Sequence, residues 1–294
     1  MKSYSTSQSP SKVWLPEDAD ASTVFEFMFN RFPRIEKEIW HQRFVEGKVQ
    51  ELNGAQIALH TSYVGGRHIV YFREVPSEVK IPFEEKILYQ NENFLIVDKP
   101  HFLPIHPSGK YVNETLISRL RLKTGNLDLV AAHRLDRLTA GLVLCILNKD
   151  VRGDFQKLFN EREIHKTYQA VGSVPEDGKT SWHLNNCLMP YRENFRMIVG
   201  EGEPNSESRI CIIKTKGDRA LFELKPTTGK KHQLRVHMAH IGSGIENDPL
   251  YPFIQEERDD DYSKPLKLLA QKLQFIDPID GSQREFISEQ KLEF

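Results

Sequence analysis

Residues 133–147 read His-Arg-Leu-Asp-Arg-Leu-Thr-Ala-Gly-Leu-Val-Leu-Cys-Ile-Leu. The last six residues, Leu142–Leu147, are all apolar, and a continuous apolar run of this length predicts a strand that is buried on both faces. One carboxylate, Asp136, therefore lies among basic residues just before a buried strand. A charge in such a place either forms a structural ion pair or is held ready for chemistry, because strongly perturbed acids concentrate at functional sites. Asp136 is the first candidate for a functional residue.

Other segments around this strand predict a fold of the α+β class. Buried or half-buried strands are expected at 93–97, 142–147, 166–171, 210–213 and 220–224, and helices at 113–123, 150–160 and 231–241. Because strands outnumber helices and several strands are joined by hairpins, we expect a mixed, mostly antiparallel sheet.

The chain is expected to divide into a leader and two domains. Residues 1–21 are polar and predict a flexible leader, residues 22–80 a small domain, and residues 85–294 the main domain, with prolines and acids at 76–85 as the linker. In the small domain, Ser22 or Thr23 can cap a first helix and a second helix should span about 35–46. A hairpin over 48–59 and a strand at 69–72 should follow.

Composition restricts the class of protein. Three scattered cysteines favour buried reduced thiols over disulfides or a metal cluster. No signal peptide and no membrane span is recognisable, so we expect a cytoplasmic protein without membrane contact. One chain carries one complete candidate site, and a monomer is the default expectation.

Charge is segregated along the sequence although the formal net charge is only −1. Residues 225–243 carry four lysines and arginines and no acid, whereas five acids crowd residues 256–261. Such a balance argues against a protein that coats nucleic acid through bulk positive charge. It remains compatible with an enzyme that holds a folded RNA by selected phosphates.

Four blocks in order resemble the RluA-type pseudouridine synthases. HRLDRLTAGLVL at 133–144 is similar to that family's catalytic signature, with Ala140 where serine is usual. Residues 87–109, the segment HKTYQA at 165–170 and the segment TGKKHQLRVH at 228–237 resemble the three other blocks, with Lys230 in place of the usual first arginine. Lysine keeps the charge there but loses the bidentate fork of a guanidinium. The resemblance covers roughly residues 85–290.

The resemblance implies a pseudouridine synthase-like catalytic domain that isomerises uridines in structured RNA, ribosomal RNA slightly ahead of transfer RNA. The reaction needs no cofactor and no metal. It needs a carboxylate nucleophile, a cavity that excludes water, and a group that takes the proton from carbon 5 of the uracil. The two helices and small sheet of residues 22–80 also resemble the RNA-binding fold named after ribosomal protein S-four, with Arg31, Arg34, Lys37 and Arg43 as its cations.

Three residues would carry the catalysis. By the resemblance, Asp136 is the nucleophile, attacking either the ring or the sugar, and the sequence leaves the covalent-adduct and glycal routes open. Arg235 would pair with Asp136 and favour its anion, or else contact a phosphate. Tyr168 would stack on the uracil and take part in proton abstraction, or else pack in the core.

The target base must leave the RNA stack before it can react. Arg134 would fill the space that it leaves or contact a phosphate, His133 would shape the loop by hydrogen bonding, and Arg137 would contact a phosphate or form an ion pair. Further RNA contacts are expected from the basic residues of the third and fourth blocks, Lys166, Lys230, Lys231 and His232.

Two other functions are conceivable for this sequence. Three histidines between 232 and 240 could suggest a metalloenzyme, but their spacing fits no compact zinc motif. A non-catalytic RNA-binding or ribosome-assembly factor with the same fold is the second alternative. Loss of Asp136 or Tyr168 would favour that reading, and both residues are present.

Overall fold

The computed structural model describes residues 4–7, 10–76, 78–256 and 259–294. The chain forms two compact units, the first made of Met1–Val79 and Pro107–Glu114 and the second of Lys80–His106 and Thr115–Phe294. The division between Val79 and Lys80 lies within the expected linker. Residues 107–114, which the sequence placed in the main domain, belong to the first unit instead. The Glu78 carboxylate explains this, because it accepts hydrogen bonds from the main-chain N–H groups of residues 112–114.

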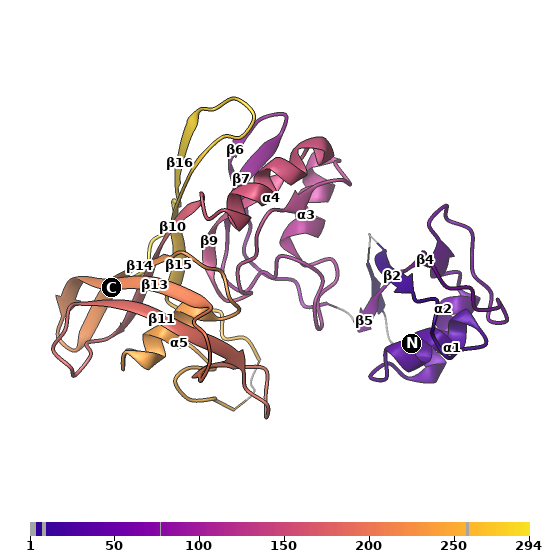
Figure 1. The fold of residues 1–294 in the computed structure, drawn as a ribbon, viewed down its shortest axis with the longest axis horizontal. Coiled ribbons are helices and arrows are strands. Elements are labelled where there is room, and N and C mark those ends of the chain that lie inside the picture. The colour runs from indigo at the N-terminus through magenta and orange to yellow at the C-terminus, as the bar shows by residue number, and fades with distance from the viewer. Residues whose placement is uncertain (1–3, 8–9, 77, 257–258) are drawn as a thin grey trace. The chain divides into compact units, whose positions relative to one another are not determined.

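The first unit contains two helices and two small sheets (Figure 1). Its elements are β1 Tyr4–Thr6, β2 Ser11–Leu15, α1 Val24–Arg31, α2 Lys37–Val45, β3 Val49–Glu51, β4 Arg67–Tyr71 and β5 Glu74–Pro76. Thr23 caps α1 by accepting a hydrogen bond from the Glu26 N–H, and Glu26 accepts one in return from the Ser22 N–H. This reciprocal arrangement satisfies main-chain donors that the first turn of a helix leaves free.

One prediction for the first unit is wrong, and another holds in part. Part of the expected flexible leader forms strands, because Ser11–Leu15 pairs with β4 and buries Leu15 in the core. The predicted hairpin is present only as a single antiparallel bridge between Gln50 and Gln56, and residues 56–59 do not form a regular strand. The longer pairing of β3 is with β4, which lies in the centre of its sheet.

The second unit is built on one large sheet of eleven strands among the described residues. The strand order is β12-β11-β13-β14-β10-β15-β9-β7-β6, with β16 paired to β15 and β8 paired to β9. Its strands are β6 Lys86–Gln90, β7 Phe94–Lys99, β8 Val130–Ala131, β9 Ala140–Ile146, β10 His165–Ser173, β11 Ser181–Pro190, β12 Met197–Gly200, β13 Ser206–Lys216, β14 Arg219–Pro226, β15 Leu268–Ile276 and β16 Gln283–Ile287. The predicted mixed, mostly antiparallel α+β fold is confirmed, since β9 and β15 are parallel and the other described pairs are antiparallel.

Three α-helices and one short 3-10 helix accompany the sheet in the described part of the second unit. These helices are α3 Leu116–Thr124, the short 3-10 helix Lys149–Val151, α4 Arg152–Asn160 and α5 Gln233–His240. Every residue of β7 and β9 is buried, and Phe155 and Leu158 of α4 pack into the same core. The apolar residues of β9 and of Phe94–Val97 in β7 are therefore explained by the central position of these two strands.

The strands β9 and β15 pass each other closely at Gly141. This glycine has a φ of 107°, and a Cβ atom there would lie 2.3 Å from the carbonyl oxygen of Ala270. Only glycine tolerates this conformation and this approach. The loop that carries Asp136 thus leads into a close parallel pairing of Gly141 with Ala270, which fixes its end. In the described part of the chain, no helix is long and apolar enough to cross a bilayer.

Candidate active site

Asp136 lies in the loop between β8 and β9, and two residues of the first sequence block hold this loop from the side of the sheet. Lys99, at the end of β7, is fully buried, and its Nζ donates to the carbonyl oxygens of Pro100 (2.8 Å), Leu103 (2.9 Å) and Arg137 (3.2 Å). The Nδ1 of His101 lies 2.7 Å from the carbonyl oxygen of Leu138. The main chain at Arg137 and Leu138 is therefore anchored to the end of β7, the strand next to β9 in the sheet.

Burial also changes the proton affinity of both anchoring groups. It lowers the pKa of Lys99 to about 7, against the opposing effect of the Asp136 charge. It lowers the pKa of His101 to about 4, so that this imidazole is neutral at physiological pH.

Arg235, in α5, is the ion-pair partner of Asp136. Its Nη1 lies 3.3 Å from Oδ2 of Asp136, while its Nε and Nη2 form a bidentate pair with Asp248 at 2.7 and 2.6 Å. Asp248 is itself fully buried and also accepts from the N–H groups of Leu250 and Tyr251. Since the pair with Asp248 fixes the plane of the guanidinium, one remaining edge of Arg235 is directed at Asp136.

His232 and Tyr251 form a second connection to the acid. The Tyr251 hydroxyl accepts from the Met197 N–H at 2.7 Å and lies 2.9 Å from Nδ1 of His232. Burial lowers the pKa of His232 to about 4, although the Asp136 charge acts in the opposite direction. If the neutral imidazole accepts the hydrogen bond from the Tyr251 hydroxyl at Nδ1, its single N–H group is at Nε2. That atom lies 4.0 Å from Oδ2 of Asp136.

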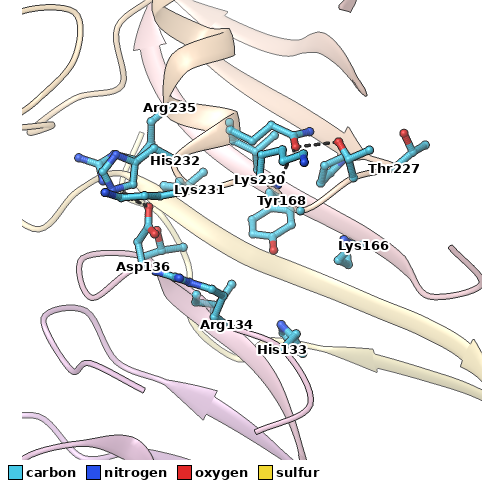
Figure 2. A pocket seen from close by; sticks show the side chains of 18 of the residues that line it. His133, Arg134, Asp136, Lys166, Tyr168, Thr227, Lys230, Lys231, His232 and Arg235 are labelled. Carbon is cyan, nitrogen blue, oxygen red and sulfur yellow. Dashed lines mark hydrogen bonds and ion pairs between the residues drawn. The ribbon is translucent and has the colours of Figure 1, made fainter. Parts of the chain in front are cut away.

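Asp136, His232 and Arg235 line a cavity of about 320 Å³ that opens to solvent. Figure 2 shows Tyr168 projecting into it, with Asp136 to one side and Lys166 to the other. Tyr168 lies on β10 at a bulge in the pairing with β15. Its ring is buried, and its hydroxyl has no hydrogen-bond partner among the described residues. Burial, reinforced by the Asp136 charge, raises the pKa of Tyr168 well above its usual value.

The wall beside Tyr168 carries one cation and one neutral imidazole. Lys166 lies two residues before Tyr168 on the same face of β10, and burial lowers the pKa of Lys166. His133 accepts a hydrogen bond at Nε2 from the Leu144 N–H at 3.1 Å and packs against the Phe159 ring. Burial, followed by repulsion from Lys166, lowers the pKa of His133 to about 3. His133 thus makes the loop-shaping hydrogen bond that the sequence suggested.

The opposite wall is the loop between β14 and α5. The buried amide of Gln233 holds this loop: its Oε1 accepts from Thr228 Oγ1 (2.7 Å) and the Lys230 N–H (3.1 Å). Its Nε2 donates to the Glu207 carbonyl (2.9 Å) and to Ser208 Oγ (2.8 Å). The amide thus uses both its oxygen and its nitrogen to hold the loop, which keeps the exposed Lys230 and Lys231 at the rim of the cavity.

Nine of the ten site residues expected from the sequence line this one cavity. They are His133, Arg134, Asp136, Lys166, Tyr168, Lys230, Lys231, His232 and Arg235. Arg134 is exposed, and Figure 2 places it next to Asp136. Arg137 does not line the cavity. It forms a bidentate ion pair with Asp260 at 2.7 and 2.9 Å, so of its two predicted roles the structure shows the ion pair.

Four residues of the site were missed in the sequence: Lys99, Gln233, Asp248 and Tyr251. Asp248 is an acid followed by Pro-Leu-Tyr-Pro, a proline-rich turn that could have marked it for attention. Asp248 follows α5 in a segment without regular secondary structure, so no sequence pattern indicates that its carboxylate pairs with Arg235. In the part of the chain that the structure describes, no three His, Cys, Asp or Glu side chains are grouped to hold a metal ion.

The arrangement can direct a carboxylate at a planar molecule that stacks on Tyr168. Asp136 is held from both sides of its loop, it faces a guanidinium, and the cavity has room for a single pyrimidine ring. The exposed cations Arg134, Lys230 and Lys231 surround the opening, where they can contact a polyanion.

Comparison with known proteins agrees with this geometry. Residues 93–240 match the model of the family described as RNA pseudouridylate synthase. An uncharacterized RNA pseudouridine synthase of Haemophilus influenzae is 31% identical over 179 residues, which cover 61% of this chain and 79% of that protein. The tRNA pseudouridine synthase C of Vibrio parahaemolyticus is 29% identical over 219 residues, covering 69% of this chain and 89% of that protein.

A yeast protein and a solved structure extend the comparison. The mitochondrial tRNA pseudouridine(32) synthase of Saccharomyces cerevisiae is 28% identical over 223 residues, but the match covers only 46% of that longer protein. The structure of human RNA Pseudouridylate Synthase Domain Containing 1 superimposes with a TM-score of 0.59 at 23% identity, covering 73% of this chain and 86% of that chain. This likeness concerns the fold.

Proposed function

The chain belongs to the RNA pseudouridylate synthase family, a family of isomerases, and we propose that it converts specific uridines of structured RNA to pseudouridine with Asp136 as the nucleophile. One observation carries the proposal. Oδ2 of Asp136 lies 3.3 Å from Nη1 of Arg235 at the edge of a cavity whose wall is Tyr168. The resulting pocket holds a directed carboxylate, a counter-ion and an aromatic platform together.

In the proposed reaction the bond between the anomeric carbon and ring nitrogen 1 breaks, and a bond between the anomeric carbon and ring carbon 5 forms. Asp136 attacks the substrate and later leaves it, on either the adduct or the glycal route. Arg235 stabilises the Asp136 carboxylate whenever that carboxylate is not bonded to the substrate. The two hydrogen bonds to Asp248 hold the guanidinium in the orientation that this requires. The proton lost from carbon 5 is balanced by the proton that nitrogen 1 gains.

Tyr168 takes part in that proton transfer by relay. Because burial raises its pKa, the hydroxyl keeps its proton at neutral pH. It can accept the carbon 5 proton only while it passes its own proton to an acceptor. The Asp136 carboxylate, which lines the same cavity and is free again after the new bond has formed, is the proposed acceptor.

The exposed cations deliver the uridine to the pocket. A base in a stack must be turned outward at a cost of a few kcal/mol, and Arg134 is exposed beside Asp136, where its planar guanidinium can stack in the space that the uridine leaves. Lys166, Lys230, Lys231 and His232 are the proposed contacts to phosphates and to the flipped nucleotide.

We also propose that the first unit binds RNA in the manner of the fold named after ribosomal protein S-four. Arg31, Arg34 and Lys37 are exposed on and between its helices and supply the positive charge. Arg43 does not belong to this set, because it is buried against the rings of Trp40 and Tyr71. Replacing the three exposed residues by glutamine should weaken RNA binding and reduce its dependence on salt. Unchanged binding over a salt titration would contradict this role.

The proposed substrates are ribosomal RNA and transfer RNA. The yeast and Vibrio relatives described above have names that specify transfer RNA, which supports the second class. A cytoplasmic location and a monomeric state are further proposals, tested by cell fractionation and by analytical ultracentrifugation.

Pseudouridine mapping in total RNA tests the proposed function. Cells that lack the gene should lose pseudouridine at one or a few positions, and the wild-type gene should restore them. Asp136→Asn should not restore them, although it preserves the shape of the side chain. If the deletion removes no pseudouridine, or if Asp136→Asn restores what was lost, the proposal fails. The latter result would favour a non-catalytic RNA-binding factor.

A further inference from the structure

We infer that the tip of the β11–β12 hairpin, residues 191–196, and the loop 250–254 form a stacking surface for an unpaired base next to the target uridine. The enzyme would accordingly select uridines in single-stranded loops or bulges over uridines inside a continuous duplex. This inference rests on the proposed function and names its substrate class. The two segments are called the aromatic rim below.

The aromatic rim adjoins the opening of the cavity. Lys231 lines the cavity, and its Nζ donates to the carbonyl oxygen of Phe195 at 2.7 Å. The same Nζ lies 5.8 Å from the centre of the Phe195 ring. A nucleotide that enters the cavity past Lys231 therefore meets Phe195.

The two segments of the aromatic rim are fastened to each other and to the acid-binding network. Arg196 donates through Nη1 to the carbonyl oxygens of Leu250 (3.1 Å) and Pro252 (3.2 Å). Its guanidinium lies 5.9 Å from the centre of the Tyr251 ring, and Tyr251 in turn contacts His232. The hairpin tip is closed by a hydrogen bond from the Tyr191 N–H to the Arg196 carbonyl at 3.0 Å. The surface is thus held in place before any RNA binds.

The side chains that this rim exposes are aromatic and basic. Phe195 is 65% exposed and Phe253 is 80% exposed, and they are the only phenylalanines with mostly exposed side chains in the described ranges. Arg192 and Lys231 are exposed beside them, and the one acid of the tip, Glu193, accepts a hydrogen bond from the Tyr191 hydroxyl. Exposed rings among cations are the combination with which proteins bind unpaired nucleotides.

Stacking on such a ring requires a base with a free face. In a continuous duplex both faces of each base are covered by its neighbours, so Phe195 could gain contact only after further unstacking. In a loop or bulge the neighbour of the target is already splayed and can stack on Phe195 at little cost. One such contact contributes about 1–3 kcal/mol, which corresponds to roughly a 5- to 150-fold difference in affinity.

The test uses the full chain and an unmodified transcript of the RNA that carries a site found by the mapping above. Single-turnover rates are measured over a series of enzyme concentrations for wild type, Phe195→Ala and Phe195→Trp. Ile276→Ala is the matched control, because Ile276 is 63% exposed and lies in β15, away from the residues that line the cavity. A second transcript lacks the base of the nucleotide on either side of the target, and a third places the target in a continuous helix.

We expect Phe195→Ala to raise the half-saturating enzyme concentration about tenfold while the saturated rate changes little, and Phe195→Trp to restore the wild-type value. With the abasic transcript, the half-saturating concentration of wild type should rise to that of Phe195→Ala, and the value for Phe195→Ala should not change. The helical transcript should react poorly with wild type. The inference is overturned if Phe195→Ala behaves like Ile276→Ala, if its defect persists on the abasic transcript, or if the helical transcript reacts as well as the loop. Lack of wild-type activity on the mapped site would instead remove the proposed function, and this inference with it.

Discussion

Replacing Lys99 with methionine should abolish a rise of stability with pH that the wild-type protein shows. Lys99 is fully buried, and its ammonium has three carbonyl oxygens as partners but no hydrogen bond to a carboxylate among the residues that the structure describes. Burial consequently lowers the pKa of Lys99 from 10.5 to about 7. Methionine has a similar length and no charge, so it fills the space without titrating.

The sign follows from the proton count. Between pH 7 and pH 10.5 the unfolded chain keeps the Lys99 proton while the folded chain releases it, so the free energy of unfolding increases with pH in this window. Below the window both states are charged, and the burial of the charge costs about 5 kcal/mol. From pH 7 to about pH 9.5, wild type should gain roughly 3 kcal/mol relative to Lys99→Met.

Urea unfolding at the two pH values, followed by circular dichroism, measures this difference. Lys157→Met is the control, since Lys157 is 70% exposed and should leave the pH dependence unchanged. Because Lys99 also binds the Arg137 carbonyl next to Asp136, the single-turnover rate of Lys99→Met should fall by roughly 100-fold. Equal changes of stability with pH in wild type and Lys99→Met would refute the reasoning.

Three further substitutions test the site and its support. Arg235→Lys keeps the charge, but one ammonium cannot form two bonds with Asp248 and also face Asp136; we expect a loss of about 3–5 kcal/mol in the free energy of unfolding together with a severe loss of rate, and retention of both would contradict the paired geometry. Tyr168→Phe should bind RNA normally but react roughly 10²- to 10⁴-fold more slowly in single-turnover assays, and a wild-type rate would exclude the hydroxyl from proton transfer. Gly141→Ala should lower the free energy of unfolding by about 3 kcal/mol or more, because its Cβ would lie 2.3 Å from the Ala270 oxygen. An unchanged melting temperature would show that β9 and β15 do not approach each other so closely.

The sequence predicted the central strands and the cavity walls because these depend on local pattern. The apolar run Leu142–Leu147 predicted a buried strand, and β9 follows this run closely. The helix expected at 113–123 is present as α3, which begins after its cap residue Thr115. Asp136, Tyr168 and Arg235 were identified through motif blocks, and the fold brings all three to one cavity.

Partners that are distant in the sequence could not be predicted in the same way. Asp248 is buried because it faces a guanidinium from α5, and nothing in its own neighbourhood shows that partner. The sequence left two roles open for Arg137, and the fold provides the ion pair by placing Asp260 beside it. Arg43 was expected among the RNA-binding cations, but aromatic rings of its own unit enclose it. In each case the tertiary contact, not the local sequence, determines whether a charge is available to RNA.

Release of tritium from RNA labelled at carbon 5 of uridine is the most direct test of Asp136 as the nucleophile, because pseudouridine formation replaces that carbon–hydrogen bond by a carbon–carbon bond. Purified full-length protein and a labelled, unmodified transcript of a mapped site suffice for the assay. Wild type should release the label in an amount that matches the number of target uridines. Asp136→Asn should bind the same transcript and release none, and release by this variant at a rate close to wild type would contradict the account.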